Sequence, residues 1–276
     1  MQRIDSHQHF WHYDPSRQSW MTNEMQVLKR NYLPEDLLPL LQQCGLGGCI
    51  AVQASQTREE NDFLLGLAAA HPFIKGVVGW IDWQSQNINE QLSYYQTVEK
   101  MKGFRHVIHD EPDKDFMLQP GFINYVTEVL QHGFVYDILI FDYHLPNTLQ
   151  FLQQLPAKAM VIDHIAKPKI SKTEIRQWKK DLKEIAAHTH IYCKISGMVT
   201  EAVWKQWKYE DFVPYMDTVM ELFGPDRVLY GSDWPVCTLS ASYADTYGIV
   251  GRYFEQMSAA EKEKFFGGNA TAVYGL

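Results

Sequence analysis

The chain has few cysteines and no long apolar run. Its four cysteines, at positions 44, 49, 193 and 237, include no C-x-x-C pair, so we expect reduced, buried thiols rather than a disulfide framework. No apolar run reaches the roughly 18 residues that a membrane-spanning helix needs. The N-terminus also lacks the basic and apolar regions of a secretory signal. These absences predict a cytoplasmic protein with no membrane partner.

Positive charge is also in short supply. The 25 lysines and arginines are outnumbered by 33 acidic residues, which leaves a net charge of -8 and disfavours nucleic acid as a partner. The hydrophobic content of 46% and charged content of 21% are typical of a globular protein. The length of 276 residues is enough for a large core, and no linker divides it. We therefore expect one domain over residues 1–276.

Short apolar runs alternate with amphipathic stretches along the whole sequence. The candidate strands are residues 3–9, 48–54, 74–81, 103–108, 134–141, 160–165, 191–195 and 228–231. The candidate helices are residues 33–44, 59–71, 87–101, 122–131, 148–155, 173–188 and 213–223. This alternation predicts an α/β fold with a parallel sheet. Eight such units favour a closed (β/α)8 TIM barrel over a doubly wound sheet, because the chain has no G-x-G-x-x-G motif and no P-loop.

Two long segments follow predicted strands and interrupt the alternation. They are residues 12–29, which are polar and aromatic, and residues 200–212, which carry Trp204 and Trp207. In a barrel, both would lie over the mouth at which active sites form. Their aromatic rings could floor a pocket or pack down on the barrel rim, and we favour rim packing because large side chains dominate burial.

The first strand ends in a His-x-His pair, His7 and His9. Side chains two positions apart share one face of a strand. Two imidazoles side by side can hold one divalent ion or one polarised substrate oxygen. The alternative interpretation is two polar residues that close an edge strand.

Titratable and polar residues also gather at the ends of the later strands. These candidates are Trp80, Asp82, Arg105, His109, His164, Lys194, Asp233 and Trp234. His164 alone could be a structural residue, and Asp233 alone could cap a helix. However, Trp234 and Pro235 do not begin an obvious amphipathic helix, which weakens the capping interpretation.

Because barrel strands end at the same mouth, we expect His7, His9, His164 and Asp233 to converge. Three imidazoles and a carboxylate can hold one ion and activate one water. Asp233 is the natural general base, since a carboxylate beside a cation stays ionised at neutral pH. Arg105 and Lys194 could direct positive charge toward an oxyanion, although Arg105 could instead form an ion pair inside the barrel.

Several segments together resemble the amidohydrolase superfamily, in the "amidohydrolase 2" branch of sugar-acid lactonases and muconolactone-type hydrolases. They are IDSHQHFW (4–11), GFRH (103–106), VIDHIAKP (161–168), LYGSDWPV (229–236) and GNATA (268–272). The resemblance is nearest to L-fuconolactonase-like enzymes and covers almost the whole chain. It implies an amidohydrolase-type barrel that hydrolyses a sugar-acid lactone, such as an L-fucono- or L-rhamnono-lactone.

The resemblance also implies roles for particular residues. His7, His9 and His164 match the family's metal-site histidines, and Asp233 matches the aspartate that activates water. Arg105, with His106 and His109, falls in a segment that contacts substrate, as do Trp80 and Asp82. The bridging lysine or glutamate of dinuclear members is missing from the fourth strand. At most one divalent ion, zinc, is therefore implied, and metal-free relatives leave open whether it is required.

Two competing functions remain open at this point. The same branch resembles zinc-dependent decarboxylases of muconate-type or aromatic acids, which share the His-x-His pair and the late aspartate. A barrel that only binds a sugar acid or assembles with partners would leave the strand-end histidines unexplained. We expect a small-molecule sugar lactone as the substrate, and the chain could form a homo-oligomer.

Overall fold

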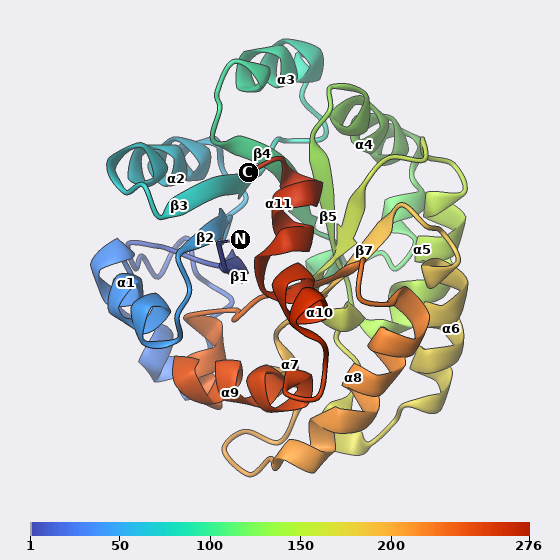
Figure 1. Cartoon of the computed structure of the whole chain (residues 1–276). Helices are drawn as coiled ribbons and strands as arrows, with labels where there is room; N and C mark the ends of the chain where they lie inside the picture. Colours follow the sequence, from blue (N-terminus) through green and yellow to red (C-terminus); the bar gives the residue numbers. More distant parts are fainter. Residues whose placement is uncertain (1) are drawn as a thin grey trace.

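Eight parallel strands follow one another around a central axis, each hydrogen-bonded to the next in sequence order, with helices on the outside (Figure 1). The computed structural model describes residues 2–276. Its strands are β1 (Ile4–Gln8), β2 (Gly48–Val52), β3 (Ile74–Gly79), β4 (Met101–Val107), β5 (Val135–Leu139), β6 (Met160–Ile162), β7 (Ile191–Ile195) and β8 (Val228–Tyr230). This arrangement confirms the predicted (β/α)8 barrel.

The longer helices lie between successive strands. They are α1 (Pro34–Gln43), α2 (Arg58–Ala70), α3 (Ile88–Gln96), α4 (Pro120–Gln131), α5 (Leu145–Leu152), α6 (Arg176–Ala186), α8 (Tyr209–Phe223) and α9 (Tyr243–Phe254). Shorter helices are α7 (Met198–Glu201), α10 (Ala259–Glu263) and α11 (Asn269–Tyr274). Local chemistry sets several starts: Thr57, Ser242 and Ser258 each accept a backbone N–H from the first turn of α2, α9 and α10.

Backbone hydrogen bonds beyond β8 close the barrel onto β1. The N–H of Asp233 donates to the carbonyl of His7 at 2.8 Å, and the N–H of His9 donates to the carbonyl of Trp234 at 2.7 Å. The closure therefore joins the segment that carries Asp233 directly to the His-x-His pair.

A small apolar cluster fills the barrel at the end where the strands begin. Its buried members are Ile4, Ile50, Val52, Val78, Val135, Val161, Leu229, Ala270 and Tyr274. The last two belong to α11, which lies across the strand starts (Figure 1), and Lys102 at the start of β4 donates to the carbonyl of Gly275 at 2.8 Å. The chain's last helix thus plugs this end of the barrel.

The element bounds differ from the predicted ones at three informative places. β6 ends at Ile162 rather than at residue 165, because the backbone turns left-handed from His164 onward. The helix predicted over 87–101 ends at Gln96, because Met101 already begins β4. Helices α9 to α11 were not predicted. Across residues 2–276, no helix combines the length and the apolar character that crossing a membrane requires.

Candidate active site

A slip in strand register brings His7 into the barrel. Asp5 faces Cys49 of β2 and Gln8 faces Ala51, so two residues of β1 lie opposite one of β2. Such a bulge redirects side chains, and it lets Ile4 pack in the inner cluster while His7, three residues later, also points inward. His9 donates from Nδ1 to the carbonyl of Val52 at 2.8 Å, which leaves its Nε2 facing the mouth.

His164 reaches the same point from a left-handed turn after β6, with φ of 53°. Its Nδ1 lies 2.9 Å from the hydroxyl oxygen of Ser196, beyond β7. A Cβ on Gly197 would come within 2.7 Å of that ring nitrogen, so only glycine lets the imidazole pack there. The contact directs the other ring nitrogen, Nε2, toward the barrel axis.

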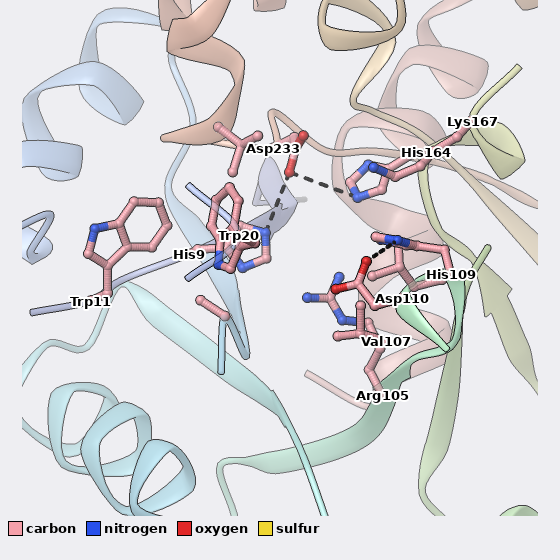
Figure 2. A pocket seen from close by; sticks show the side chains of 13 residues that line it. His9, Trp11, Trp20, Arg105, Val107, His109, Asp110, His164, Lys167 and Asp233 are labelled. Atoms are coloured by element: carbon pink, nitrogen blue, oxygen red, sulfur yellow. Dashed lines mark ion pairs between the residues drawn. The ribbon is translucent and has the colours of Figure 1, made fainter. Parts of the chain in front are cut away.

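All three histidines lie near one carboxylate oxygen, Oδ1 of Asp233. Asp233 Oδ1 lies 3.4 Å from His9 Nε2, 3.8 Å from His164 Nε2 and 4.0 Å from His7 Nε2, and Figure 2 shows His9 and His164 directed at it from opposite sides. Burial alone would raise the pKa of Asp233, but His164, His9 and the charge of Lys167 bring it below its ordinary value. The carboxylate is therefore ionised at neutral pH and able to accept a proton.

A layer of buried charge lies directly beneath His7. Asp163 Oδ1 is 3.2 Å from His7 Nδ1, and Lys194 Nζ lies 3.0 Å from Asp163 and 2.5 Å from Asp137. Arg105 NH1 donates to Asp163 Oδ2 at 3.0 Å and lies 3.2 Å from His7 Nε2. Two cations and two carboxylates thus balance one another beneath the histidine.

These contacts assign the proton of His7. Its Nδ1–H faces the Asp163 carboxylate, so Nε2 is the acceptor for the Arg105 guanidinium. Burial, the largest influence, lowers the pKa of His7 well below its usual range. Burial would raise the pKa of Asp163, but Lys194, His7 and Arg105 hold it well below normal. His7 is accordingly a neutral imidazole oriented by an ionised carboxylate.

Above the carboxylate lies a cavity of about 220 Å³ that opens at the carboxyl ends of the strands. It is lined by His9, Trp11, Trp20, Ala54, Arg105, Val107, His109, Asp110, Leu139, His164, Lys167, Asp233 and Val236. In Figure 2, the labelled side chains come from both sides of the cavity and surround one space. Its volume is below the roughly 300–1,000 Å³ of pockets for drug-sized ligands, so it has room for about one sugar ring.

The structure brings together some of the predicted substrate contacts and not others. Arg105 and His109 line the cavity. Lys194 is fully buried beneath His7, and Trp234 is buried between Phe10 and Tyr32.

The third-strand candidates also lie outside the cavity lining. Asp82 is exposed and accepts the backbone N–H of Gln84, while Trp80 donates to His106 Nδ1 at 3.2 Å. In the 200–212 segment, Trp204 and Trp207 donate to backbone carbonyls of Thr200 and Ser240. These two rings pack on the barrel rim, as we favoured, whereas the same expectation was wrong for Trp20 of the 12–29 segment, which lines the cavity.

Four residues near the cavity were not singled out by sequence reasoning. Each lies beside or within a predicted feature. The VIDHIAKP segment contains Asp163 and Lys167 on either side of His164, Asp110 follows His109, and Trp20 lies in the 12–29 segment. A signal for Asp163 was present. In both β5 and β6, an inward-facing valine is followed two residues later by an inward-facing aspartate: Val135 by Asp137, and Val161 by Asp163. A charged residue at an inward position was therefore visible in the sequence.

Among the described residues, His7, His164 and Asp233 can each offer one ligand atom within 4.8 Å of the others. Two imidazole nitrogens and a carboxylate oxygen form a donor set that zinc accepts. These three residues therefore fit one divalent ion, whereas His9, the fourth predicted ligand, lies outside this group. The guanidinium of Arg105 donates to the same His7 nitrogen, so an ion and Arg105 would compete for it.

Comparison with known proteins places this geometry among related enzymes. A family model described as amidohydrolase matches residues 4–276. A protein of Burkholderia multivorans named L-fucono-1,5-lactonase is 39% identical, over 99% of this chain and 96% of that protein. A Burkholderia ambifaria protein of the same name is 33% identical, over 99% of this chain and 95% of that protein.

A solved structure gives the same picture in three dimensions. The crystal structure of an amidohydrolase from Burkholderia multivorans with bound zinc is 39% identical, covers all of both chains and superposes with a TM-score of 0.96. A 2,6-dihydroxybenzoate decarboxylase from Rhizobium, at 14% identity and a TM-score of 0.67, shares the fold alone. The decarboxylase alternative thus has less support than the lactonase.

Proposed function

The chain belongs to the amidohydrolase family, and on that premise we propose that it hydrolyses the ester bond of a sugar-acid lactone. Full-length relatives named L-fucono-1,5-lactonase support this reaction and this class of substrate. The observation that carries the proposal is the single carboxylate oxygen of Asp233, which faces three imidazoles beside a cavity with room for one sugar ring.

The reaction starts with the lactone carbonyl near His9 and His164 and a water beside Asp233. Asp233 takes a proton from the water while the water oxygen bonds to the carbonyl carbon, and this gives a tetrahedral oxyanion. The carbon–oxygen bond of the ring then breaks, and Asp233 returns the proton to the leaving ring oxygen. The product is an open-chain hydroxy acid, and the carboxylate of Asp233 is regenerated.

His7 contributes by its orientation. Because Nδ1–H of His7 donates a hydrogen bond to Asp163, the Nε2 side of His7 faces the reacting region together with Arg105. Burial is the main reason that the pKa of His7 lies well below its usual range, so the ring stays neutral and does not compete with Asp233 for a proton.

Zinc is the cofactor that we propose for this site, in a ratio of at most one ion per chain. His7, His164 and Asp233 would hold it, and it would supply Lewis-acid polarisation of the carbonyl oxygen. The zinc-bound relative supports this choice. Metal analysis of the purified protein measures the ratio, and two tightly bound ions per chain would contradict the proposal.

The experiment that tests the function is a pH-indicator screen of sugar lactones with the wild type and Asp233→Asn. We expect turnover of one or more aldonolactones and a loss of roughly 10²–10⁴-fold in kcat/KM in the variant, the usual contribution of a general base. Asp62→Asn, at an exposed position of α2, is the control and should match the wild type. Near-normal activity of Asp233→Asn would remove the proposed base, and release of CO2 from muconate-type acids without lactone turnover would favour the decarboxylase.

A further inference from the structure

Four consecutive residues after β6 adopt a left-handed backbone although none is glycine. They are His164, Ile165, Ala166 and Lys167, with φ of 53°, 48°, 60° and 45°. This conformation is unfavourable for residues with a Cβ. It persists only where the surrounding structure enforces it, most often at functional sites. His164 accounts for the first of these positions, and Lys167 at the last has no role so far.

The turn places Lys167 on the same side as His164. The N–H of Lys167 donates to the carbonyl of His164 at 2.8 Å, which closes a three-residue turn, and side chains three positions apart in such a turn are eclipsed. Both residues accordingly line the cavity beside Asp233 (Figure 2). The strained backbone thus delivers an imidazole and an ammonium to one space.

The two cations of the cavity differ in how far they are engaged. Arg105 donates to Asp163, to His7 and to the carbonyl of Gln53. Lys167 Nζ lies 3.6 Å from Glu201 Oε1 and 5.6 Å from the centre of the Phe141 ring. Among the described residues, the ion pair with Glu201 is the contact that the structure gives its ammonium with a carboxylate. Lys167 is therefore the less engaged of the two cations, because turning toward a bound molecule would cost it one ion pair at 3.6 Å and not a buried network.

We propose that Lys167 is the residue that stabilises the oxyanion formed when water attacks the lactone carbonyl, an inference that rests on the proposed function. As the new carbon–oxygen bond forms, the carbonyl electron pair moves onto oxygen, and the ammonium donates a hydrogen bond to that charge. The charge leaves this oxygen when the ring bond breaks, and Lys167 keeps its proton throughout. Glu201 holds the ammonium at the cavity wall before the attack.

The test compares Lys167→Met, Lys167→Arg and the control Lys169→Met by steady-state kinetics on the best lactone of the screen. Lys169 lies two residues further on, with a half-exposed side chain that pairs with Asp142 and Glu174 rather than with the cavity. We expect Lys167→Met to lower kcat by about 10²–10³-fold, as does the loss of an oxyanion donor elsewhere, while KM stays within about threefold. Lys167→Arg should recover part of the loss, and Lys169→Met should equal the wild type.

The split between kcat and KM identifies the role, because an interaction made only in the transition state lowers kcat without weakening substrate binding. A Lys167→Met kcat within about threefold of the wild type overturns the inference, and so does a rise in KM at unchanged kcat. If Lys167→Met does not fold, Lys167→Gln is judged by the same limits. Lactone turnover that requires Asp233 but not Lys167 overturns this inference alone. A wild type without any lactone turnover overturns the proposed function as well.

Discussion

The two ends of the barrel are built from the same eight strands but from opposite chemistry. Where the strands begin, the interior holds valine, isoleucine and leucine side chains closed off by Ala270 and Tyr274. Where they end, it holds Arg105, Lys194 and two buried aspartates beneath the histidines. Neighbouring positions on the same strands therefore lie either in a dry apolar core or in a charged layer.

The change from uncharged to charged side chains occurs between two successive inward-facing positions of a strand, which are two residues apart. Gly103 is followed inward by Arg105, Val135 by Asp137 and Tyr192 by Lys194. Burying charge is costly unless each ion is paired, and here each carboxylate faces a lysine or an arginine. The comparison indicates that the apolar end stabilises the fold, whereas the charged end orients His7 at some cost in stability. This agrees with the division of roles between the two faces of such barrels.

One line of contacts crosses the boundary between the ends. The hydroxyl of Tyr274 donates to Asp137 at 2.7 Å, Asp137 pairs with Lys194, and Lys194 pairs with Asp163, which holds His7. The plug and the active site are thus linked through three ionic side chains. Substitutions along this line separate effects on stability from effects on catalysis.

The largest effect is expected at Asp163→Asn, on the charged side of the boundary. The neutral amide no longer fixes the His7 proton and leaves Lys194 and Arg105 short of a counter-charge. We expect kcat to fall at least about 100-fold and the free energy of unfolding to fall by about 3 kcal/mol. Chemical denaturation and steady-state kinetics on the folded fraction measure the two losses.

The matched control is Asp181→Asn at a half-buried surface site of α6, where the carboxylate contacts only Gln177 among the hydrogen bonds of the described chain. It should change neither quantity. If Asp163→Asn kept a normal kcat, His7 would not depend on its buried partner, and the comparison between the two ends would lose its catalytic half.

A smaller effect is expected at Tyr274→Phe, on the plug side. The ring still packs in the inner cluster, but the hydrogen bond to Asp137 is lost. A hydrogen bond to a charged group contributes about 1.5–3 kcal/mol, so the unfolding free energy should fall by about that amount while kcat stays within about twofold. A loss in kcat as large as that of Asp163→Asn would show that the plug tunes chemistry, contrary to the division drawn here.

The strand-end candidates were readable from the sequence because position along a barrel strand determines position in space. His7 and His9 end the first predicted strand, His164 and Asp233 follow apolar runs, and parallel strands all end at one mouth. Their proximity in the structure agrees with that logic. The same reasoning did not separate inward from outward positions, which is why Lys194 was expected at the substrate and lies beneath His7.

Two features were beyond reach of pattern alone. The bulge in β1 shifts the inward face by one residue, and no residue type there announces it. The left-handed turn at 164–167 contains no glycine, so ordinary turn chemistry would not place Lys167 in the cavity. The C-terminal plug was missed for another reason: α11 has only six residues, too few for a helical pattern to emerge.

The smallest effect is expected at the mouth, far from the charged layer. Trp20 lines the cavity with 36% of its surface exposed and meets Trp11 edge-on at 6.3 Å between ring centres. An aromatic face contributes about 0.5–1.5 kcal/mol beyond burial, so Trp20→Ala should raise KM by roughly 2–10-fold without changing kcat or the melting temperature. Trp204→Ala on the rim is the control and should leave KM unchanged. Equal shifts in both variants would mean that the 12–29 segment is rim packing as well, and that substrate recognition lies entirely within the barrel.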